Sequence, residues 1–240
     1  MPLAALALAS HGLVGAVESC TVASPRAVSP VIELYTSEGC NSCPPADRWL
    51  STLKASPSVV ALAFHVDYWD RLGWKDRFAS PAFTNRQATQ QAGTGARFSY
   101  TPQVVIDGRD RKDWRSIGAP LSSRPPAVVA VSLAREGDRY VATVVPGAGA
   151  PARLAAYWAV TEQDHVTAVR AGENEGATLR HDFVVRDYAL VPGWSMKTGT
   201  AETLRFKPVS AGDAAHPRSV NLVVVDAASG RPVQAVKLAC

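Results

Sequence analysis

The chain has 240 residues, a formal net charge of +4 and an apolar fraction of 47%, values that are typical of a globular protein with a packed core. Its basic residues are scattered and do not form runs interleaved with aromatic residues, so the composition argues against nucleic-acid binding. The length allows one large domain or two smaller ones.

The N-terminal segment, residues 1–17, is mainly small and apolar and resembles a secretory signal that ends near Val14-Gly15-Ala16. Ser10 and His11 interrupt the apolar run, and the alternative is a buried N-terminal helix. The run is too short to span a bilayer, so we predict no integral membrane span. We therefore expect a periplasmic or secreted protein.

The first half of the chain alternates between apolar runs and helical patterns. Residues 31–36 and 59–64 are predicted strands, and the apolar spacing between them predicts a helix that ends near residue 56. A strand, a helix and a strand in this order favour a parallel pair with a right-handed crossover. A polar helix over residues 81–92, a strand that starts at residue 104 and a helix over residues 112–121 complete the pattern.

Two cysteines, Cys40 and Cys43, lie between the first predicted strand and the helix that follows it. Their spacing lets the sulfurs close a small disulfide, and a helix N-terminus stabilises a thiolate. The helix can begin at either cysteine. If it begins at Cys43, Pro44 occupies the first helical position, whereas if it begins at Cys40, Pro44 removes an early backbone hydrogen bond.

The amino-acid sequence around these cysteines resembles that of a known family. The motifs that carry the resemblance are Tyr-Thr-Ser-Glu-Gly-Cys-Asn-Ser-Cys-Pro-Pro-Ala-Asp at residues 35–47, Phe-His-Val-Asp-Tyr-Trp-Asp at 64–70, Gly-Trp-Lys-Asp at 73–76, Tyr-Thr-Pro-Gln at 100–103 and Gly-Glu-Asn-Glu-Gly at 172–176. They look like those of a secreted bacterial thioredoxin-like family that is catalogued as a domain of unknown function. The resemblance covers nearly the whole mature chain.

The resemblance implies roles for particular residues. Cys40 would be the attacking thiol and Cys43 the resolving thiol, and Thr101-Pro102 would form a cis-proline loop that faces them and binds substrate. His65 and Asp67, at the end of the second strand, are further candidate site residues, with ordinary loop or core hydrogen bonds as the alternative. The dipeptide between the cysteines is Asn-Ser, not the Gly-Pro of thioredoxin.

Beyond a linker at residues 122–126, the pattern changes to short alternating runs punctuated by Gly, Pro and Asp. This rhythm predicts an antiparallel β-sandwich of about eight strands. We place His181 and Asp182 on a strand surface, with contact to the first half as the alternative. The predicted fold class is therefore an α/β thioredoxin-like domain over residues 28–122 followed by an all-β antiparallel sandwich domain over residues 127–240.

The remaining cysteines, Cys20 and Cys240, lie near the two ends of the chain. In an oxidising compartment they can form a structural disulfide, because the termini of a domain are often close together. The alternative is two free or intermolecular thiols.

The function predicted from these features is thiol–disulfide exchange through the Cys-x-x-Cys pair, with protein or small-molecule thiols and disulfides as partners. The sequence assigns no cofactor and no metal. Two alternatives stay open. One is a non-catalytic binding or envelope protein that keeps an inert cysteine pair, and the other is a Cu(I) carrier in which His65 supplies a third ligand.

Overall fold

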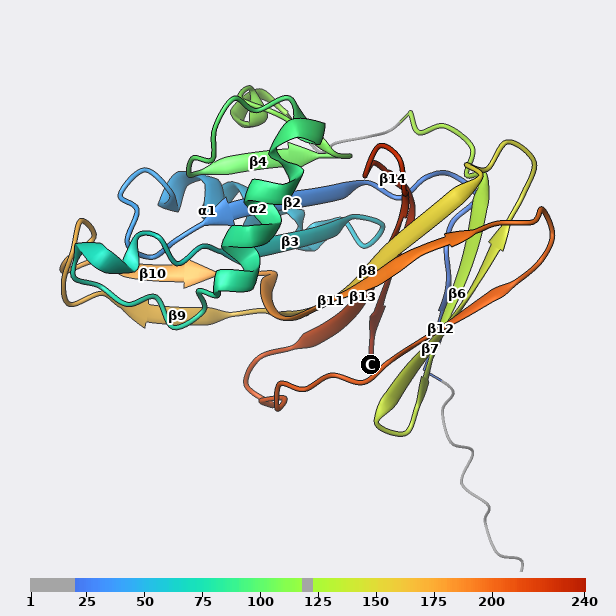
Figure 1. The fold of residues 1–240 in the computed structure, drawn as a ribbon. Helices are drawn as coiled ribbons and strands as arrows, with labels where there is room; N and C mark the ends of the chain where they lie inside the picture. The colour runs from blue at the N-terminus through green and yellow to red at the C-terminus, as the bar shows by residue number, and fades with distance from the viewer. Residues whose placement is uncertain (1–19, 118–122) are drawn as a thin grey trace, which may run out of the picture.

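The structure is a computed structural model that describes residues 20–117 and 123–240 (Figure 1). The signal-like segment predicted at residues 1–17 lies outside the described residues. Within them the chain forms fourteen β-strands and two α-helices. Among these residues no helix has the length and apolar character needed to cross a membrane.

An eight-stranded mixed sheet runs through the whole molecule (Figure 1). Its strands, in spatial order, are β14 (Pro232–Ala239), β13 (Arg218–Asp226), β8 (Arg153–Glu162), β11 (Val184–Ser195), β3 (Val60–His65), β2 (Val31–Thr36), β4 (Gln103–Ile106) and β5 (Arg109–Asp110). The pairs β2–β3 and β3–β11 are parallel, and the other neighbours are antiparallel. Both halves of the sequence therefore contribute to one sheet.

A second, four-stranded antiparallel sheet packs against the part of the large sheet built from the second half of the chain. Its order is β1 (Thr21–Ala23), β6 (Val129–Glu136), β7 (Arg139–Pro146) and β12 (Glu202–Phe206). The core between the two sheets is centred on Trp158, which stacks on Phe206 with ring centroids 5.2 Å apart. A disulfide joins Cys20, before β1, to Cys240, after β14, and so links the edges of the two sheets.

The other part of the large sheet is covered by a helix on each face (Figure 1). Alternate residues of β2 point to opposite faces. Ile32 and Leu34 pack with Leu50 of α1 (Pro44–Ser51), which continues as a 3-10 turn η1 (Thr52–Ala55). Val31 and Tyr35 belong instead to the core that Phe83 of α2 (Pro81–Thr94) closes. The end of this sheet is therefore rigidly packed where β2 leads into the cysteine pair.

A two-stranded hairpin, β9 (His165–Ala168) and β10 (Thr178–His181), extends from the second half toward α1. It lies beside α1 at the end of the molecule where β2 and β3 finish (Figure 1). The hairpin carries His181 at its C-terminal end and encloses the segment 169–177. It therefore brings residues of the second half next to the cysteine pair.

The predicted fold class is wrong. A separate α/β thioredoxin-like domain would end its sheet at β3. In the structure the sheet continues, because β11 pairs with β3: Val184 lies opposite Ala63, and Ala63 N donates to Phe183 O at 2.8 Å. All six residues of β3 are buried, so its outer backbone groups need a partner within the protein. That partner lies far away in the sequence, and local patterns do not reveal it.

Two smaller expectations also change. The helix predicted over residues 112–121 is a single 3-10 turn, η3 (Trp114–Ser116), and residues 118–121 lie outside the described part. The second half is β-rich and sandwich-like, as predicted, but four of its strands belong to the mixed sheet that it shares with the first half.

Candidate functional site

Cys40 and Cys43 form a disulfide in the turn between β2 and α1, with their Cα atoms 5.5 Å apart. Cys43 is the N-cap residue of α1, and Pro44 occupies the first helical position, where a missing N–H costs no helical hydrogen bond. This settles which cysteine begins the helix. Cys40 lies in the preceding turn, and its carbonyl accepts a hydrogen bond from Cys43 N at 3.2 Å.

Two hydroxyl groups contact the sulfur of Cys40. Thr101 Oγ1 donates to Cys40 Sγ at 3.2 Å, and Ser42 Oγ lies 3.3 Å from the same atom. Trp69 Nε1 donates to Thr101 Oγ1 at 2.8 Å, which leaves the hydroxyl proton of Thr101 free to point at sulfur. The Thr101–Pro102 peptide bond is cis. The structure thus brings the Thr101–Pro102 segment against the cysteine pair.

The turn that carries the cysteine pair is hydrogen-bonded to the segment 172–176, which we name the cover loop. The side-chain amide of Asn174 donates to the carbonyl oxygens of Glu38 at 2.8 Å and Cys40 at 3.0 Å, and Glu173 accepts from Asn41 N at 3.2 Å. Both cysteines are 0% exposed. Any reaction partner must therefore displace the cover loop or enter beside it.

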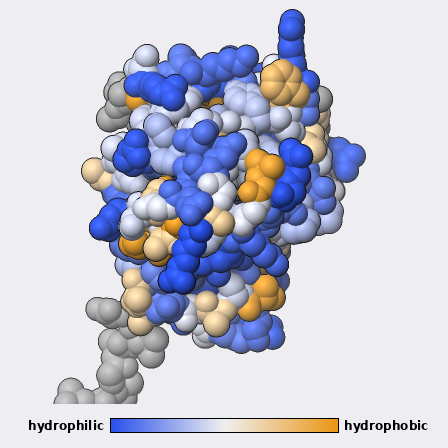
Figure 2. All heavy atoms as spheres, turned by 90° about the vertical axis from the view of Figure 1, so that its left-hand side faces the viewer, coloured by the Kyte–Doolittle hydropathy of each residue, from blue (hydrophilic) through white to orange (hydrophobic). Residues whose placement is uncertain are grey.

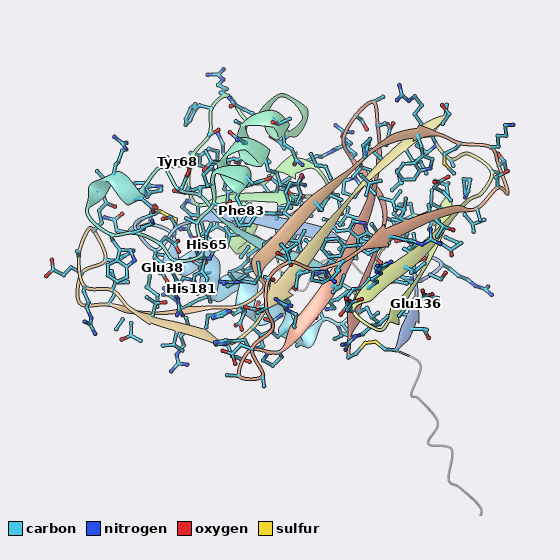
Figure 3. All side chains as sticks on the ribbon, turned by 60° about the horizontal axis from the view of Figure 1, so that its bottom comes forward. Glu38, His65, Tyr68, Phe83, Glu136 and His181 are labelled. Carbon is cyan, nitrogen blue, oxygen red and sulfur yellow. A yellow bond between two sulfur atoms is a disulfide. The ribbon has the colours of Figure 1, made fainter. Side chains whose placement is uncertain are left out.

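A cluster of ionisable side chains lies buried next to this turn. We call it the buried cluster; its members are 0–6% exposed and comprise Glu38, Asp47, His65, Asp76 and His181. They come from the end of β2, from α1, from the end of β3, from the loop that follows β3 and from β10. Figure 3 shows Glu38, His65 and His181 close together, and Glu136 far away at the other end of the molecule.

Asp76 organises one side of the buried cluster. Its Oδ2 accepts from His65 Nδ1 at 2.7 Å and from Glu38 N at 2.9 Å, and its Oδ1 accepts from Phe78 N at 2.9 Å. Burial alone would raise the pKa of Asp76, but His65 and these backbone donors outweigh it and lower the pKa to about 2. Asp76 is therefore an ionised acceptor, and His65 carries its proton on Nδ1.

His181 lies between two carboxylates. Its Nδ1 is 3.6 Å from Asp47 Oδ1 and its Nε2 is 3.5 Å from Glu38 Oε1. Burial lowers the pKa of His181, but Asp47 and Glu38 outweigh it and raise the pKa to about 10. Glu38 is held on its other oxygen by Trp74 Nε1 at 2.8 Å. In the absence of another cation, a protonated His181 therefore balances the charge of Asp47 and Glu38.

The sequence of residues 31–225 matches a family described as a protein of unknown function, DUF1223. The chain belongs to this family. The match confirms the predicted membership of a domain-of-unknown-function family. Among curated proteins, none matches the sequence of this DUF1223 member.

Two solved structures are similar to this DUF1223 member. One is the crystal structure of protein AGR_C_4864 from Agrobacterium tumefaciens, with 29% sequence identity and a TM-score of 0.65, covering 90% of this chain and 96% of that one. The other is HBP35 of Porphyromonas gingivalis, with 16% identity and a TM-score of 0.60, covering 89% of this chain and 76% of that one. The second likeness concerns the fold alone.

The site residues predicted from the sequence divide into four places in this DUF1223 member. Cys40, Cys43, Thr101 and Pro102 meet at one point, whereas His65 belongs to the buried cluster. Asp67 accepts from the hydroxyl of Thr84 on α2, at 2.5 Å, so its contacts hold a helix in place. The pair Cys20 and Cys240 lies between the two sheets of the sandwich.

Sequence reasoning missed the residues that complete the site. His181 is 2% exposed and faces the first half, not the strand surface on which we placed it. Asp47, Asp76 and Asn174 were not singled out, although all three lie within the motifs that carried the family resemblance. The glycine at position 172 was a sequence signal for a special backbone conformation in the cover loop. In the structure its φ is +76°, which favours glycine, and a Cβ there would lie 3.2 Å from Trp74 Cβ.

Proposed function

We propose that this protein performs thiol–disulfide exchange at the Cys40–Cys43 disulfide, with a protein or a small-molecule thiol as its partner. The observation that carries the proposal is the pair of hydroxyl groups at Cys40 Sγ, from Thr101 at 3.2 Å and from Ser42 at 3.3 Å. A disulfide sulfur is a weak acceptor, whereas a thiolate accepts strong charge-assisted hydrogen bonds. The arrangement therefore supports Cys40 as the nucleophile of the reduced protein.

The exchange proceeds through a mixed disulfide. The Cys40 thiolate attacks one sulfur of a substrate disulfide, whose S–S bond breaks and releases one substrate thiolate. The Cys43 thiolate then attacks Cys40 Sγ, which releases the second substrate thiolate and closes the Cys40–Cys43 disulfide. Two electrons pass from the protein to the substrate, and the protons that the cysteines lose are taken up by the substrate thiolates. The reverse sequence oxidises a substrate dithiol.

The cover loop controls access to these sulfurs. It is held against the turn that carries them by the two bonds that Asn174 donates and by the bond that Glu173 accepts. The surface at this end of the molecule is mainly hydrophilic, and its hydrophobic residues are scattered (Figure 2). We therefore expect a partner that displaces the cover loop through polar contacts along the backbone, and not one that docks on an apolar patch.

The decisive experiment is a redox titration of the native protein. The oxidised chain is equilibrated with dithiothreitol or glutathione buffers, free thiols are trapped by alkylation, and the fold is followed by circular dichroism. We expect reversible reduction of Cys40 and Cys43 with the fold intact, and a Cys43→Ser variant that traps a mixed disulfide at Cys40. The matched Cys40→Ser variant should trap none. A pair that is reduced only when the protein unfolds would overturn the proposal.

The cover loop gives this experiment a second variant. Each neutral hydrogen bond contributes about 1 kcal/mol, so Asn174→Ala, which removes two, should speed the reduction of the disulfide by a small dithiol up to about thirtyfold. An equal rate in the variant and in the wild type would show that the cover loop does not limit access.

A second candidate is a non-catalytic binding or envelope protein in which the cysteine pair is a structural disulfide. The observation in its favour is that Cys40 and Cys43 are both 0% exposed. Under this function the native pair would resist dithiols, and Asn174→Ala would leave it equally resistant. The redox titration therefore separates the two functions.

We also propose that the protein works in an oxidising compartment, in the periplasm or outside the cell. Two disulfides in one chain support this location, because such bonds persist where thiols are not kept reduced. Cell fractionation with an alkaline phosphatase fusion tests it. Activity of a fusion joined after residue 17 is the expected result, and a fusion that stays inactive in the cytoplasm would contradict it.

A further inference from the structure

We propose that Asp47, His65 and His181 bind a divalent transition-metal ion, with Zn²⁺ as the ion that their chemistry fits best. Each of the three offers one ligand atom, and these atoms all lie within 4.8 Å of one another. All three side chains are buried. Two imidazoles and one carboxylate, with a fourth position left to water, form a common zinc ligand set. This inference goes beyond thiol–disulfide exchange and does not depend on it.

His65 is oriented as a ligand. Its Nδ1–H donates to Asp76 at 2.7 Å, so its lone pair lies on Nε2. His65 is 0% exposed, and its Nε2 has no hydrogen-bond partner among the described residues. A buried nitrogen without a hydrogen-bond partner destabilises the fold unless an ion or a water molecule binds to it. A carboxylate on the far nitrogen is the arrangement that fixes metal-bound histidines in other proteins.

His181 and Asp47 complete the set in the same manner. His181 directs Nδ1 toward Asp47 Oδ1 at 3.6 Å and Nε2 toward Glu38 Oε1 at 3.5 Å, and neither nitrogen has a hydrogen-bond partner within residues 20–117 and 123–240. The hydroxyl of Thr36 donates to Asp47 Oδ2 at 3.0 Å and leaves Oδ1 free. Glu38 lies beside Nε2 of His181, but at 3.5 Å it does not form the hydrogen bond that Asp76 forms with His65 at 2.7 Å.

Charge favours a cation at this point. Glu38, Asp47 and Asp76 place three carboxylates in a space where burial excludes water, against two imidazoles. Buried carboxylates require a compensating charge, and a divalent ion supplies it while it leaves both imidazoles neutral. Ligand atoms on a tetrahedral zinc ion lie about 3.3 Å apart, so small side-chain rotations bring the three atoms onto the ion.

A cavity lies against two of the three proposed ligands. A cavity of about 110 Å³ lies between the start of α1 and β10, and Asp47 and His181 are part of its lining. Arg48 and Arg180 also line it, but both are exposed, so solvent and salt screen their charges. The volume exceeds the roughly 10–15 Å³ that a cavity needs to hold one water, so the cavity can hold water beside Asp47 and His181.

The experiment uses the full chain with Cys40–Cys43 oxidised, so that these sulfurs cannot bind metal. The protein is treated with a chelator, then dialysed against Zn²⁺ or Co²⁺, and the bound metal is measured by elemental analysis. We expect one ion per chain and a Co²⁺ absorption spectrum of nitrogen and oxygen ligands without a thiolate charge-transfer band. This spectrum reports the ligands of the wild-type protein even where a variant fails to fold.

Variants identify the ligands. His181→Gln and Asp47→Asn should lose stoichiometric binding, and Asp76→Asn should weaken it about ten- to hundredfold, as the loss of an orienting carboxylate does. One control should bind as the wild type does: His165→Gln, which removes a histidine that is 4% exposed but lies outside the cluster.

Two results would overturn the inference: a folded, oxidised wild type that takes up neither ion stoichiometrically, or wild-type affinity in both His181→Gln and Asp47→Asn when they are folded.

Discussion

Replacement of Thr101 by valine tests whether the contact at Cys40 Sγ serves chemistry. Thr101 Oγ1 lies 3.2 Å from the sulfur, and the indole of Trp69 occupies its acceptor side at 2.8 Å. In the reduced protein this hydroxyl donates to the Cys40 thiolate. A hydrogen bond to a charged group contributes about 1.5–3 kcal/mol, so Thr101→Val should lower the thiolate fraction at neutral pH by about tenfold to a hundredfold.

The expected change in rate is smaller than the change in thiolate fraction. A thiolate that is less stabilised is also more nucleophilic, and this offsets almost half of the loss on a logarithmic scale. Alkylation of Cys40 in reduced Thr101→Val should therefore be about four- to fifteenfold slower than in the wild type at neutral pH. At alkaline pH, where both proteins are fully ionised, the variant should react at least as fast as the wild type.

The assay is a time course with iodoacetamide across a pH series, in which mass spectrometry reports modification of Cys40. Thr101→Ser is the matched control because it keeps the hydroxyl, and it should follow the wild-type profile. The cover loop is the same in all three proteins, so the ratio of their rates does not depend on how often it opens. Equal rates for Thr101→Val and the wild type at neutral pH would refute the role of the hydroxyl.

Two further predictions concern stability. The first removes the Cys20–Cys240 disulfide by alanine at both positions. Because the bond spans 220 residues, the chain-entropy model gives a loss of about 5 kcal/mol in the free energy of unfolding, measured in urea. A loss under about 1 kcal/mol would contradict it. The pKa of His165 is lowered to about 4 by burial and by the neighbouring His216, against the opposing effect of Glu162. Because the unfolded chain protonates His165 first, the stability contributed by this group is present above about pH 6.5 and is lost as the pH falls toward 4. His165→Gln should flatten that part of the pH profile of the unfolding midpoint, and an unchanged slope would contradict the assignment.

Local patterns were enough to predict the elements around the cysteine pair. Strand β2 spans Val31–Thr36 as expected, because its apolar residues serve cores on both faces of the sheet. Helix α2 begins at Pro81, where Ser80 accepts a hydrogen bond from Ala82 N, and this kind of start can be recognised in a sequence. The juxtaposition of Cys40 with Thr101 was implied only by the resemblance to a family; in the structure Thr101 Oγ1 lies 3.2 Å from Cys40 Sγ.

The fold class could not be predicted in the same way. An apolar run such as β3 shows that both faces of a strand are buried, but it does not identify the strand that pairs with each edge. The partner on one edge of β3 is β11, more than a hundred residues away, and the register rests on Val184 opposite Ala63. Sequence reasoning therefore found the strands of each half and wrongly divided them into two independent folds.

The same long-range pairing explains why the buried cluster escaped prediction. Asp47 and His65 come from the first half, but His181 stands at the end of a hairpin in the second half, and an alternating strand pattern suggests a solvent-exposed face as readily as a buried one. The pairing of β11 with β3 places that hairpin against α1. The geometry of the cluster is thus a consequence of the sheet that joins the two halves.

The surroundings of the cysteine pair include residues from the second half of the chain. Asn174 and His181 both belong to the second half, yet Asn174 bonds to the carbonyl oxygens of Glu38 and Cys40, and His181 balances the charge of Asp47 and Glu38. Residues of the first half alone would leave the β3 edge unpaired and two buried carboxylates without a compensating charge, each of which costs several kcal/mol. The arrangement around Cys40 therefore requires the complete mixed sheet, because that sheet holds the buried cluster and the cover loop in place.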